Sequence, residues 1–136
     1  MRSLVREHLL ASKMKVLVID DDYWTRRITV AALVHAGVAT IEAATGKEGF
    51  DLAIRERPTC ILLDFFLPDC EGTEILDELR SLESEPIPVI FVTSLLDETQ
   101  RLKLIELGAA AVIAKPVDLL ALPCAIEKIV GKTAND

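Results

Sequence analysis

Four short apolar runs recur along the chain, and each ends in polar residues. They lack the strict alternation of a strand with one face in water, so they are typical of strands buried on both faces of a sheet. A fifth, weaker run lies between the first and the second of them. The predicted strands are Lys15–Ile19, Ala39–Ala43, Thr59–Leu63, Pro88–Val92 and Ala110–Ala114.

Helical patterns alternate with these runs, which favours repeated strand–helix units around a parallel sheet. Gly37 and Gly108 follow two of the patterns at a position where glycine commonly ends a helix. Pro123 lies inside the last pattern and removes a hydrogen bond, so we expect a kink or a late helix start there. The predicted helices are Trp24–Ala36, Gly46–Arg55, Thr73–Leu82, Asp97–Leu107 and one that begins near Asp118.

Polar groups of complementary chemistry follow the predicted strands. In an open parallel sheet, ligands bind outside the carboxyl ends of the strands, so one edge is expected to gather these side chains. Carboxylates, hydroxyls and an ammonium group together suit a divalent metal and a phosphoryl group. The residues are Asp20, Asp21, Asp64, Thr93, Ser94 and Lys115.

The aspartate run after the first strand has two interpretations. It suits a solvated turn that caps the next helix, with Asp22 as the best candidate for the cap. It also suits a metal site, because clustered carboxylates repel one another, have raised pKa values and favour a divalent cation such as Mg²⁺. A carboxylate such as Asp64 can in addition accept a phosphoryl group.

Composition limits the classes of protein that remain. The chain has 136 residues, 51% hydrophobic and 27% charged, which suits one core-rich domain. A net charge of −7 with scattered Lys and Arg predicts no direct binding to nucleic acid or to a membrane surface. No run reaches the roughly 20 apolar residues that span a bilayer. Three cysteines without disulfide or metal spacing favour a cytoplasmic protein.

Taken together, these motifs resemble the receiver domain of bacterial response regulators over residues 15–130. The resemblance implies a flavodoxin-like α/β fold: a single doubly wound domain whose five-stranded parallel sheet has the order 2-1-3-4-5, with five helices. Residues 14–131 would form the domain, 1–13 an extension of uncertain role and 132–136 a tail. The motifs are Asp20-Asp21, Leu62–Pro68 followed by Gly72, Thr93-Ser94 and Lys115-Pro116.

The resemblance also implies a function in two-component phosphorelay signalling. Asp64 would accept a phosphoryl group from a phosphohistidine on a sensor histidine kinase or a histidine phosphotransferase. Asp21, Asp64 and the backbone carbonyl of Phe66 would bind Mg²⁺ directly, and Asp20 would act largely through water. The phosphorylated domain would control a downstream output protein or domain. It would be no enzyme beyond promoting its own phosphoryl transfer and slow autodephosphorylation.

The remaining motif residues would form the conformational switch. Lys115 would pair with Asp64 before phosphorylation and with a phosphoryl oxygen afterwards. Thr93 would move to donate to another phosphoryl oxygen, next to the small residue Ser94. The Lys115–Pro116 bond is expected to be cis, as is common in the family.

Three apolar residues depart from the family's usual pattern. Val112 stands where an aromatic residue usually couples to the switch, so we expect loop and helix shifts to carry the readout instead. Phe66 and Leu95 flank the path of the attacking water, which predicts a long-lived phosphoryl group.

Two helices are apolar over more than one face, around Ile28–Val34 and Leu102–Leu107. Broad burial explains this, and so does a partner or dimer surface on either helix. Two alternatives to the signalling function also remain. One is a haloacid-dehalogenase-like phosphatase that uses Asp20 and Asp22, and the other is a receiver-like interaction module that is not phosphorylated.

Overall fold

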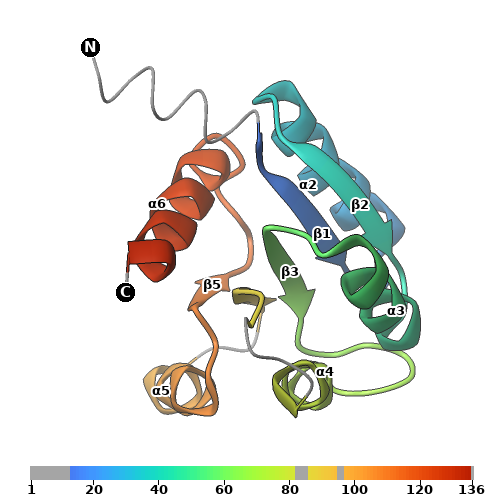
Figure 1. Cartoon of the computed structure of the whole chain (residues 1–136), viewed down its shortest axis with the longest axis vertical. Coiled ribbons are helices and arrows are strands. Elements are labelled where there is room, and N and C mark those ends of the chain that lie inside the picture. The colour runs from blue at the N-terminus through green and yellow to red at the C-terminus, as the bar shows by residue number, and fades with distance from the viewer. Residues whose placement is uncertain (1–12, 82–85, 95–96, 136) are drawn as a thin grey trace.

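The fold is a parallel sheet between two layers of helices (Figure 1). The computed structural model describes residues 13–81, 86–94 and 97–135. All strand pairs are parallel and the strand order is β2-β1-β3-β4-β5, which confirms the predicted topology. The strands are β1 (Lys15–Ile19), β2 (Ala39–Ala43), β3 (Cys60–Asp64), β4 (Val89–Thr93) and β5 (Ala111–Ala114).

Five helices of the described chain cover both faces of this sheet. Two of them, α2 and α6, pack on one face, and α3, α4 and α5 pack on the other (Figure 1). The helices are α2 (Tyr23–His35), α3 (Gly46–Glu56), α4 (Gly72–Ser81), α5 (Glu98–Leu107) and α6 (Leu122–Asn135).

The central strand β1 shows why the runs are continuously apolar. Val16 and Val18 belong to the core beneath α2 and α6, whereas Leu17 and Ile19 belong to the core beneath α3, α4 and α5. All four are at most 3% exposed. Complete burial stabilises the fold by roughly 1.5–3 kcal/mol for each such side chain. Because both faces are covered, the four positions from Val16 to Ile19 do not tolerate a polar residue, whereas Lys15 at the start of the strand is only half-buried.

Local signals place the helix ends. The Asp22 side chain accepts a hydrogen bond from Thr25 N–H at 2.8 Å and caps α2, as predicted. Asp97 forms a reciprocal capping box with Gln100 at the start of α5. Gly37 (φ 87°) and Gly108 (φ 113°) follow α2 and α5 in the left-handed conformation that glycine adopts at little cost.

The last helix begins at Leu122 rather than near Asp118. Asp118 Oδ1 accepts from Leu120 N–H (3.1 Å) and Ala121 N–H (3.2 Å), so it caps a preceding turn instead of the helix. Pro123 then lies in the first turn of α6, where a backbone N–H would have no acceptor within the helix, so the missing donor costs nothing. The late helix start expected from this proline is confirmed.

Two of the predicted strands end one residue later than expected. Asp64 and Thr93 are the last residues of β3 and β4, because parallel pairing continues through Asp64 with Val92 and through Thr93 with Ala114. Several sequence expectations lie outside the described residues: the structure of residues 1–12, the helix end at Leu82 and the position of Leu95.

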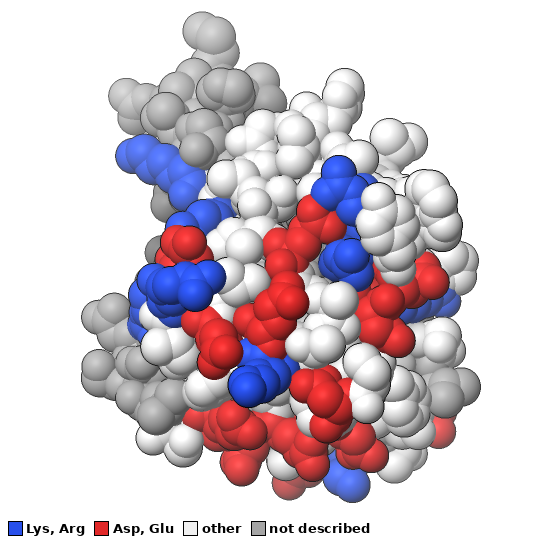
Figure 2. Space-filling model, turned by 90° about the vertical axis from the view of Figure 1, so that its right-hand side faces the viewer, with Lys and Arg blue, Asp and Glu red and all other residues white. Residues whose placement is uncertain are grey.

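Charge is mixed on the side of the molecule formed by α2, β2 and α3. Figure 2 shows Lys and Arg side chains interspersed with Asp and Glu there, and acidic residues gather along its lower edge. The described residues of this face form no continuous basic surface. Among the described residues, no helix has both the length and the apolar character needed to cross a membrane.

Candidate functional site

Three carboxylates meet at the carboxyl ends of β1 and β3. Asp20 and Asp21 follow β1, and Asp64 ends β3, its neighbour in the sheet. Each of the three offers an oxygen, and these oxygens lie within 4.8 Å of one another. Asp20 is buried, Asp64 is half-buried and Asp21 is exposed, so the cluster opens to solvent on one side. Such a set of hard oxygen donors fits a divalent cation like Mg²⁺.

Lys115 brings a positive charge to the same cluster from the end of β5. Its Nζ lies 3.3 Å from Asp64 Oδ2 and 3.4 Å from Asp20 Oδ2. Its backbone N–H donates to the Thr93 carbonyl at 2.9 Å, and the following bond to Pro116 is cis, as expected. The side chain therefore reaches across from β5 to β3 and β1.

The pKa values reflect this arrangement. Burial raises the pKa of the Asp64 carboxyl, the Lys115 ammonium opposes that effect, and the Asp20 carboxylate adds to it, so the pKa stays above its ordinary value. Burial disfavours the charge on Lys115, but Asp20 and Asp64 outweigh burial and raise its pKa. Lys115 is thus held in its charged form, whereas the ionised form of Asp64 is less favourable than that of an exposed carboxylate.

Asp22 does not join the cluster. Its carboxylate accepts hydrogen bonds from the backbone N–H and the hydroxyl of Thr25, which lower its pKa. The capping interpretation is therefore correct for this residue. A phosphatase that used Asp20 and Asp22 as its two acidic groups would need Asp22 to leave the cap, so the structure gives that alternative no support.

The two residues predicted to take part in the switch, Thr93 and Ser94, lie at the end of β4. Thr93 is only 3% exposed, whereas Ser94 is exposed. Thr93 lines a cavity of about 340 Å³ together with Phe66 and Leu104, among other residues of the β3–α4 loop, α4 and α5. Val112, on β5, packs against the core on the same side of the sheet as α5.

Phe66 lies at the edge of this site. Its side chain is 52% exposed, and its ring packs edge-on against Phe65 with the centroids 4.7 Å apart. An exposed apolar side chain therefore lies two positions after Asp64 in the chain.

Arg26 supports the acidic pair and was not singled out from the sequence. Its Nη1 donates to the Asp20 carbonyl at 2.8 Å, and its Nε donates to Glu42 Oε1 at 3.1 Å. The side chain is only 12% exposed. It thus links α2, the end of β1 and β2. The sequence signal was an arginine one helical turn after an aspartate cap, which is too common to be informative.

A comparison with family models decides the class of this chain. Residues 16–127 match the model described as the response regulator receiver domain. The chain belongs to this family. The receiver domain is a signalling domain of two-component systems, and the predicted family and fold are both confirmed.

Curated relatives of this receiver domain differ in length. It is 37% identical over 120 residues to a probable transcriptional regulator, ycf27, of Porphyridium aerugineum, which covers 88% of this chain and 49% of the relative. It is 35% identical to the sporulation initiation phosphotransferase F of Bacillus subtilis, covering 89% of this chain and 97% of the relative. The chain therefore spans about half the length of some relatives and nearly all of another.

Solved structures show the same fold. The receiver domain is similar to a CheY-like response regulator receiver domain protein of Methanospirillum hungatei, with a TM-score of 0.81 and 30% identity. That match covers 90% of this chain and 97% of the other. The receiver domain of a Francisella response regulator gives a TM-score of 0.83 at 25% identity, covering 89% and 99%.

Proposed function

We propose that this receiver domain accepts a phosphoryl group on Asp64 from a phosphohistidine of a partner protein. The observation that carries the proposal is the contact of Lys115 with both Asp64 and Asp20 at the edge where three carboxylate oxygens converge. It supports the proposal because an Asp64 oxygen lies next to a cation and among carboxylate oxygens of the kind that bind a metal. In phosphoryl transfer, catalysis consists mainly of such positioning and charge neutralisation.

The transfer itself needs little from the protein. An Asp64 oxygen forms a bond to phosphorus while the phosphorus–nitrogen bond of the phosphohistidine breaks, and the imidazole leaves with its electron pair. Lys115 is placed to neutralise an oxygen of the transferred group, and the Thr93 hydroxyl is the candidate donor to another. Hydrolysis of the resulting acyl phosphate by water, which regenerates Asp64, is the proposed slow autodephosphorylation.

The donor set for Mg²⁺ consists of Asp21, Asp64 and the Phe66 carbonyl, with Asp20 acting through water. Oxygen ligands with one or two carboxylates and several waters are what Mg²⁺ prefers. Bound Mg²⁺ would supply positive charge to the transferring phosphoryl group. The raised pKa of Asp64 supports this assignment, because it indicates a carboxylate in need of a further cation.

The readout is proposed to run through the end of β4 and through α5. Val112 has no ring to rotate, so the movement of Thr93 must be transmitted by backbone shifts towards the Asp97 cap. Beryllofluoride, which mimics the phosphoryl group, should shift the amide resonances of Thr93, Ser94 and Asp97. Unchanged resonances at these three residues in the complex would contradict this route.

Partners follow from the same chemistry. We infer a sensor histidine kinase or a histidine phosphotransferase as the donor, and an output protein or domain as the recipient of the signal. Some of the apolar residues suspected of forming a partner or dimer surface are exposed: Ile28 and Val34 on α2 are 50% and 55% exposed, and Leu102 on α5 is 55% exposed. Others in the same two stretches are buried: Val30, Leu33 and Leu104. The three free cysteines support a cytoplasmic setting.

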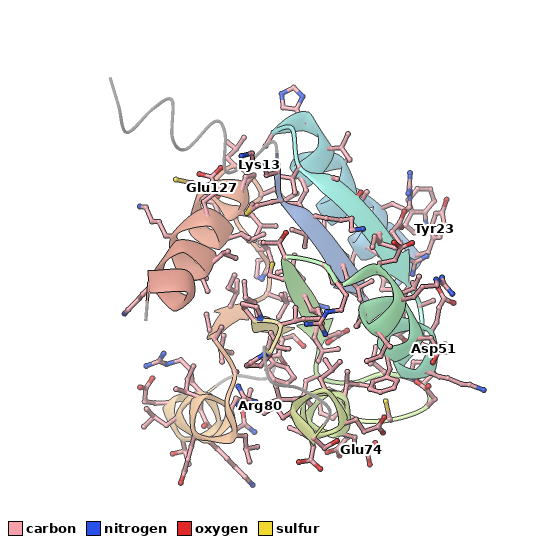
Figure 3. All side chains as sticks on the ribbon, viewed as in Figure 1. Lys13, Tyr23, Asp51, Glu74, Arg80 and Glu127 are labelled. Atoms are coloured by element: carbon pink, nitrogen blue, oxygen red, sulfur yellow. The ribbon has the colours of Figure 1, made fainter. Side chains whose placement is uncertain are left out.

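One experiment tests the proposal. The protein is incubated with Mg²⁺ and acetyl phosphate or phosphoramidate, and intact mass is measured. We expect one added phosphoryl group in the wild type and none in Asp64→Asn. The matched control is Asp51→Asn, an exposed carboxylate of α3 (Figure 3), which should be modified as the wild type is.

Each alternative gives a different result. A phosphatase would turn over substrate without retaining the phosphoryl group and would depend on Asp20. An interaction module that is not phosphorylated would show neither retention nor turnover. Retention of the phosphoryl group by Asp64→Asn would place the acceptor elsewhere.

A further inference from the structure

The loop between β3 and α4, residues 65–71, carries the Phe66 carbonyl proposed as a metal ligand. Two backbone hydrogen bonds close this loop into a small hairpin. They run from Gly72 N–H to the Phe65 carbonyl (2.7 Å) and from Leu67 N–H to the Cys70 carbonyl (3.1 Å). Phe66 pairs with Glu71 between these two bonds. Asp69 therefore lies near the tip of the hairpin, with Phe66 on one of its arms.

The tip is held from outside by α3. The two oxygens of Asp69 accept hydrogen bonds from Gly46 N–H (2.8 Å) and Lys47 N–H (2.9 Å), the first two residues of that helix. Thr45, the local cap, accepts from Glu48 N–H. Asp69 thus satisfies two N–H groups that a helix cannot satisfy itself. The two bonds also lower the pKa of Asp69, with the bond from Gly46 as the larger cause.

Two glycines leave the space that the loop needs to pack closely: Gly46 of α3 lies beside the tip, and Gly72 lies at the base. A β-carbon at Gly46 would lie 2.2 Å from Cys70 Sγ and 3.3 Å from Asp69 Oδ1. A β-carbon at Gly72 would lie 2.8 Å from the Asp64 carbonyl oxygen. Neither glycine has a positive φ, so what each position requires is space rather than an unusual backbone conformation. The loop is therefore packed tightly against α3 at its tip and against the end of β3 at its base (Figure 1).

We propose that Asp69 is a positioning residue for the metal site: it ties the tip of the β3–α4 loop to α3 and thereby fixes the Phe66 carbonyl. The inference rests on the proposed function, because it assumes that Phe66 provides a metal ligand. Asp69 is outside the cluster of Asp20, Asp21 and Asp64 and acts only through the backbone. Without it, the tip of the loop loses both hydrogen bonds to α3, and the arm that carries Phe66 has to be ordered when the metal binds.

The test measures Mg²⁺ affinity without phosphorylation. The carbonyl carbon of Phe66 is followed by NMR in the full chain with labelled phenylalanine while Mg²⁺ is added. Asp69→Ala should raise the Mg²⁺ dissociation constant about tenfold, the lower end of what residues that orient metal ligands contribute. Asp69→Asn keeps one acceptor oxygen and should give a smaller increase. In both variants the Phe66 signal of the metal-free protein should shift.

The control separates positioning from charge. Asp77 is an exposed carboxylate on α4 that lines the same groove between α3 and α4 as Asp69, together with Glu74, which Figure 3 labels. Asp77→Asn removes one negative charge and should change the dissociation constant by about twofold or less, since exposed charges are screened. Equal effects of Asp69→Ala and Asp77→Asn would overturn the proposal.

A second pair of variants approaches the contact from the helix. Gly46→Ala removes the space for the loop and should weaken Mg²⁺ binding as Asp69→Ala does, which also covers the case in which Asp69→Ala does not fold. Gly131→Ala, on α6 with open space around it, is the control for the glycine substitution. Unchanged Mg²⁺ affinity in Gly46→Ala and Asp69→Asn would overturn the proposal.

Failure of this inference is distinguishable from failure of the proposed function. A wild type that binds Mg²⁺ but takes up no phosphoryl group contradicts the function, while the affinities still test Asp69. Normal phosphorylation with unchanged affinity in the Asp69 variants contradicts only the positioning role. A wild type in which Mg²⁺ does not move the Phe66 signal overturns the positioning proposal.

Discussion

At the scale of single residues, the site depends on one cation shared between two acids. Lys115 contacts Asp20 and Asp64 at nearly the same distance, so neither carboxylate is fully compensated. Burial favours the neutral form of Asp64 and the remaining repulsion from Asp20 adds to this. A carboxylate in this state favours a further cation beside it, because each additional positive charge lowers the free-energy cost of burying its negative charge.

The first prediction concerns how ionisation of Asp64 changes the free energy of unfolding with pH. Its folded-state pKa is raised, so between the ordinary value of about 3.9 and the folded value the folded protein binds more protons than the unfolded chain. The stability that Asp64 contributes is therefore present below pH 4 and lost as the pH rises through the folded pKa. Asp64→Asn has no group that ionises at this position, so it does not lose this stability as the pH rises.

Unfolding by urea at several pH values measures the effect. Without Mg²⁺, the free energy of unfolding of Asp64→Asn relative to the wild type should increase from pH 3.5 to pH 7, by less than about 1 kcal/mol once solvent screening is included. Saturating Mg²⁺ should remove the advantage of the variant at pH 7. A difference that shrinks with rising pH would contradict the raised pKa.

The second prediction concerns Phe66 and the lifetime of the phosphoryl group. Its exposed ring offers no hydrogen bond to a water that approaches Asp64, and Asn at this position would offer one. A single such bond contributes about 0.5–1.5 kcal/mol, so Phe66→Asn should speed dephosphorylation up to about tenfold. Decay of the phosphorylated protein measures it. Phe66→Leu, which stays apolar, should decay as the wild type does, and an unchanged rate in Phe66→Asn would refute water exclusion by Phe66.

At the scale of elements, the sheet edge collects the site and the helices hold it in place. The register of β3 against β4 sets Asp64 beside Val92, so that Thr93 lies one position beyond it. Two helices add support that is remote in sequence: α2 through Arg26 and α3 through its bonds to Asp69. The site is therefore built on the strands but fastened to the helices on both faces of the sheet.

The third prediction compares two neighbouring arginines of α2. Arg26 and Arg27 both pair with Glu42, but only Arg26 also donates to the Asp20 carbonyl, and its side chain is 12% exposed against 49% for Arg27. Arg26→Ala should lower the free energy of unfolding by about 1.5–3 kcal/mol. Arg27→Ala should lower it by about 1 kcal/mol or less. Equal losses in chemical denaturation would contradict a specific role for Arg26.

At the scale of the whole molecule, charge and metal binding are linked. The net charge is −7, and part of the acidic surface lies at the site itself. A divalent cation that binds only the folded protein adds to its stability by mass action. Stability of the whole domain is thus a reporter of the site.

The fourth prediction follows. At a free Mg²⁺ concentration one hundred times its dissociation constant, the free energy of unfolding should rise by about 2.7 kcal/mol. Asp21→Asn, which removes a proposed ligand from an exposed position, should lose most of this increase, whereas Asp51→Asn should keep it. Thermal unfolding with and without Mg²⁺ at constant ionic strength provides the measurement. Equal increases in the two variants would exclude Asp21 as a ligand.

The sequence by itself determined the sheet, its strands and the residues at its carboxyl edge. Buried parallel strands need continuous apolar runs, and each run is followed by polar residues at the carboxyl edge of the sheet, so Asp20, Asp64, Thr93 and Lys115 could be located from the pattern alone. The caps at Asp22 and Gly37 were equally local, because their hydrogen bonds join residues a few positions apart. The start of α6 was misplaced, since Asp118 caps a turn as readily as a helix.

Only the tertiary structure decided how this edge is supported. The bonds of Asp69 to α3 span 22 and 23 positions, and the bond of Arg26 to Asp20 depends on how α2 packs against the sheet. Nothing in the residues beside Asp69 indicates that its partners are the N–H groups of a distant helix. The sharing of Lys115 between two carboxylates likewise depends on the lateral order of β1, β3 and β5. Contacts between distant segments are set by packing, which a local pattern does not encode.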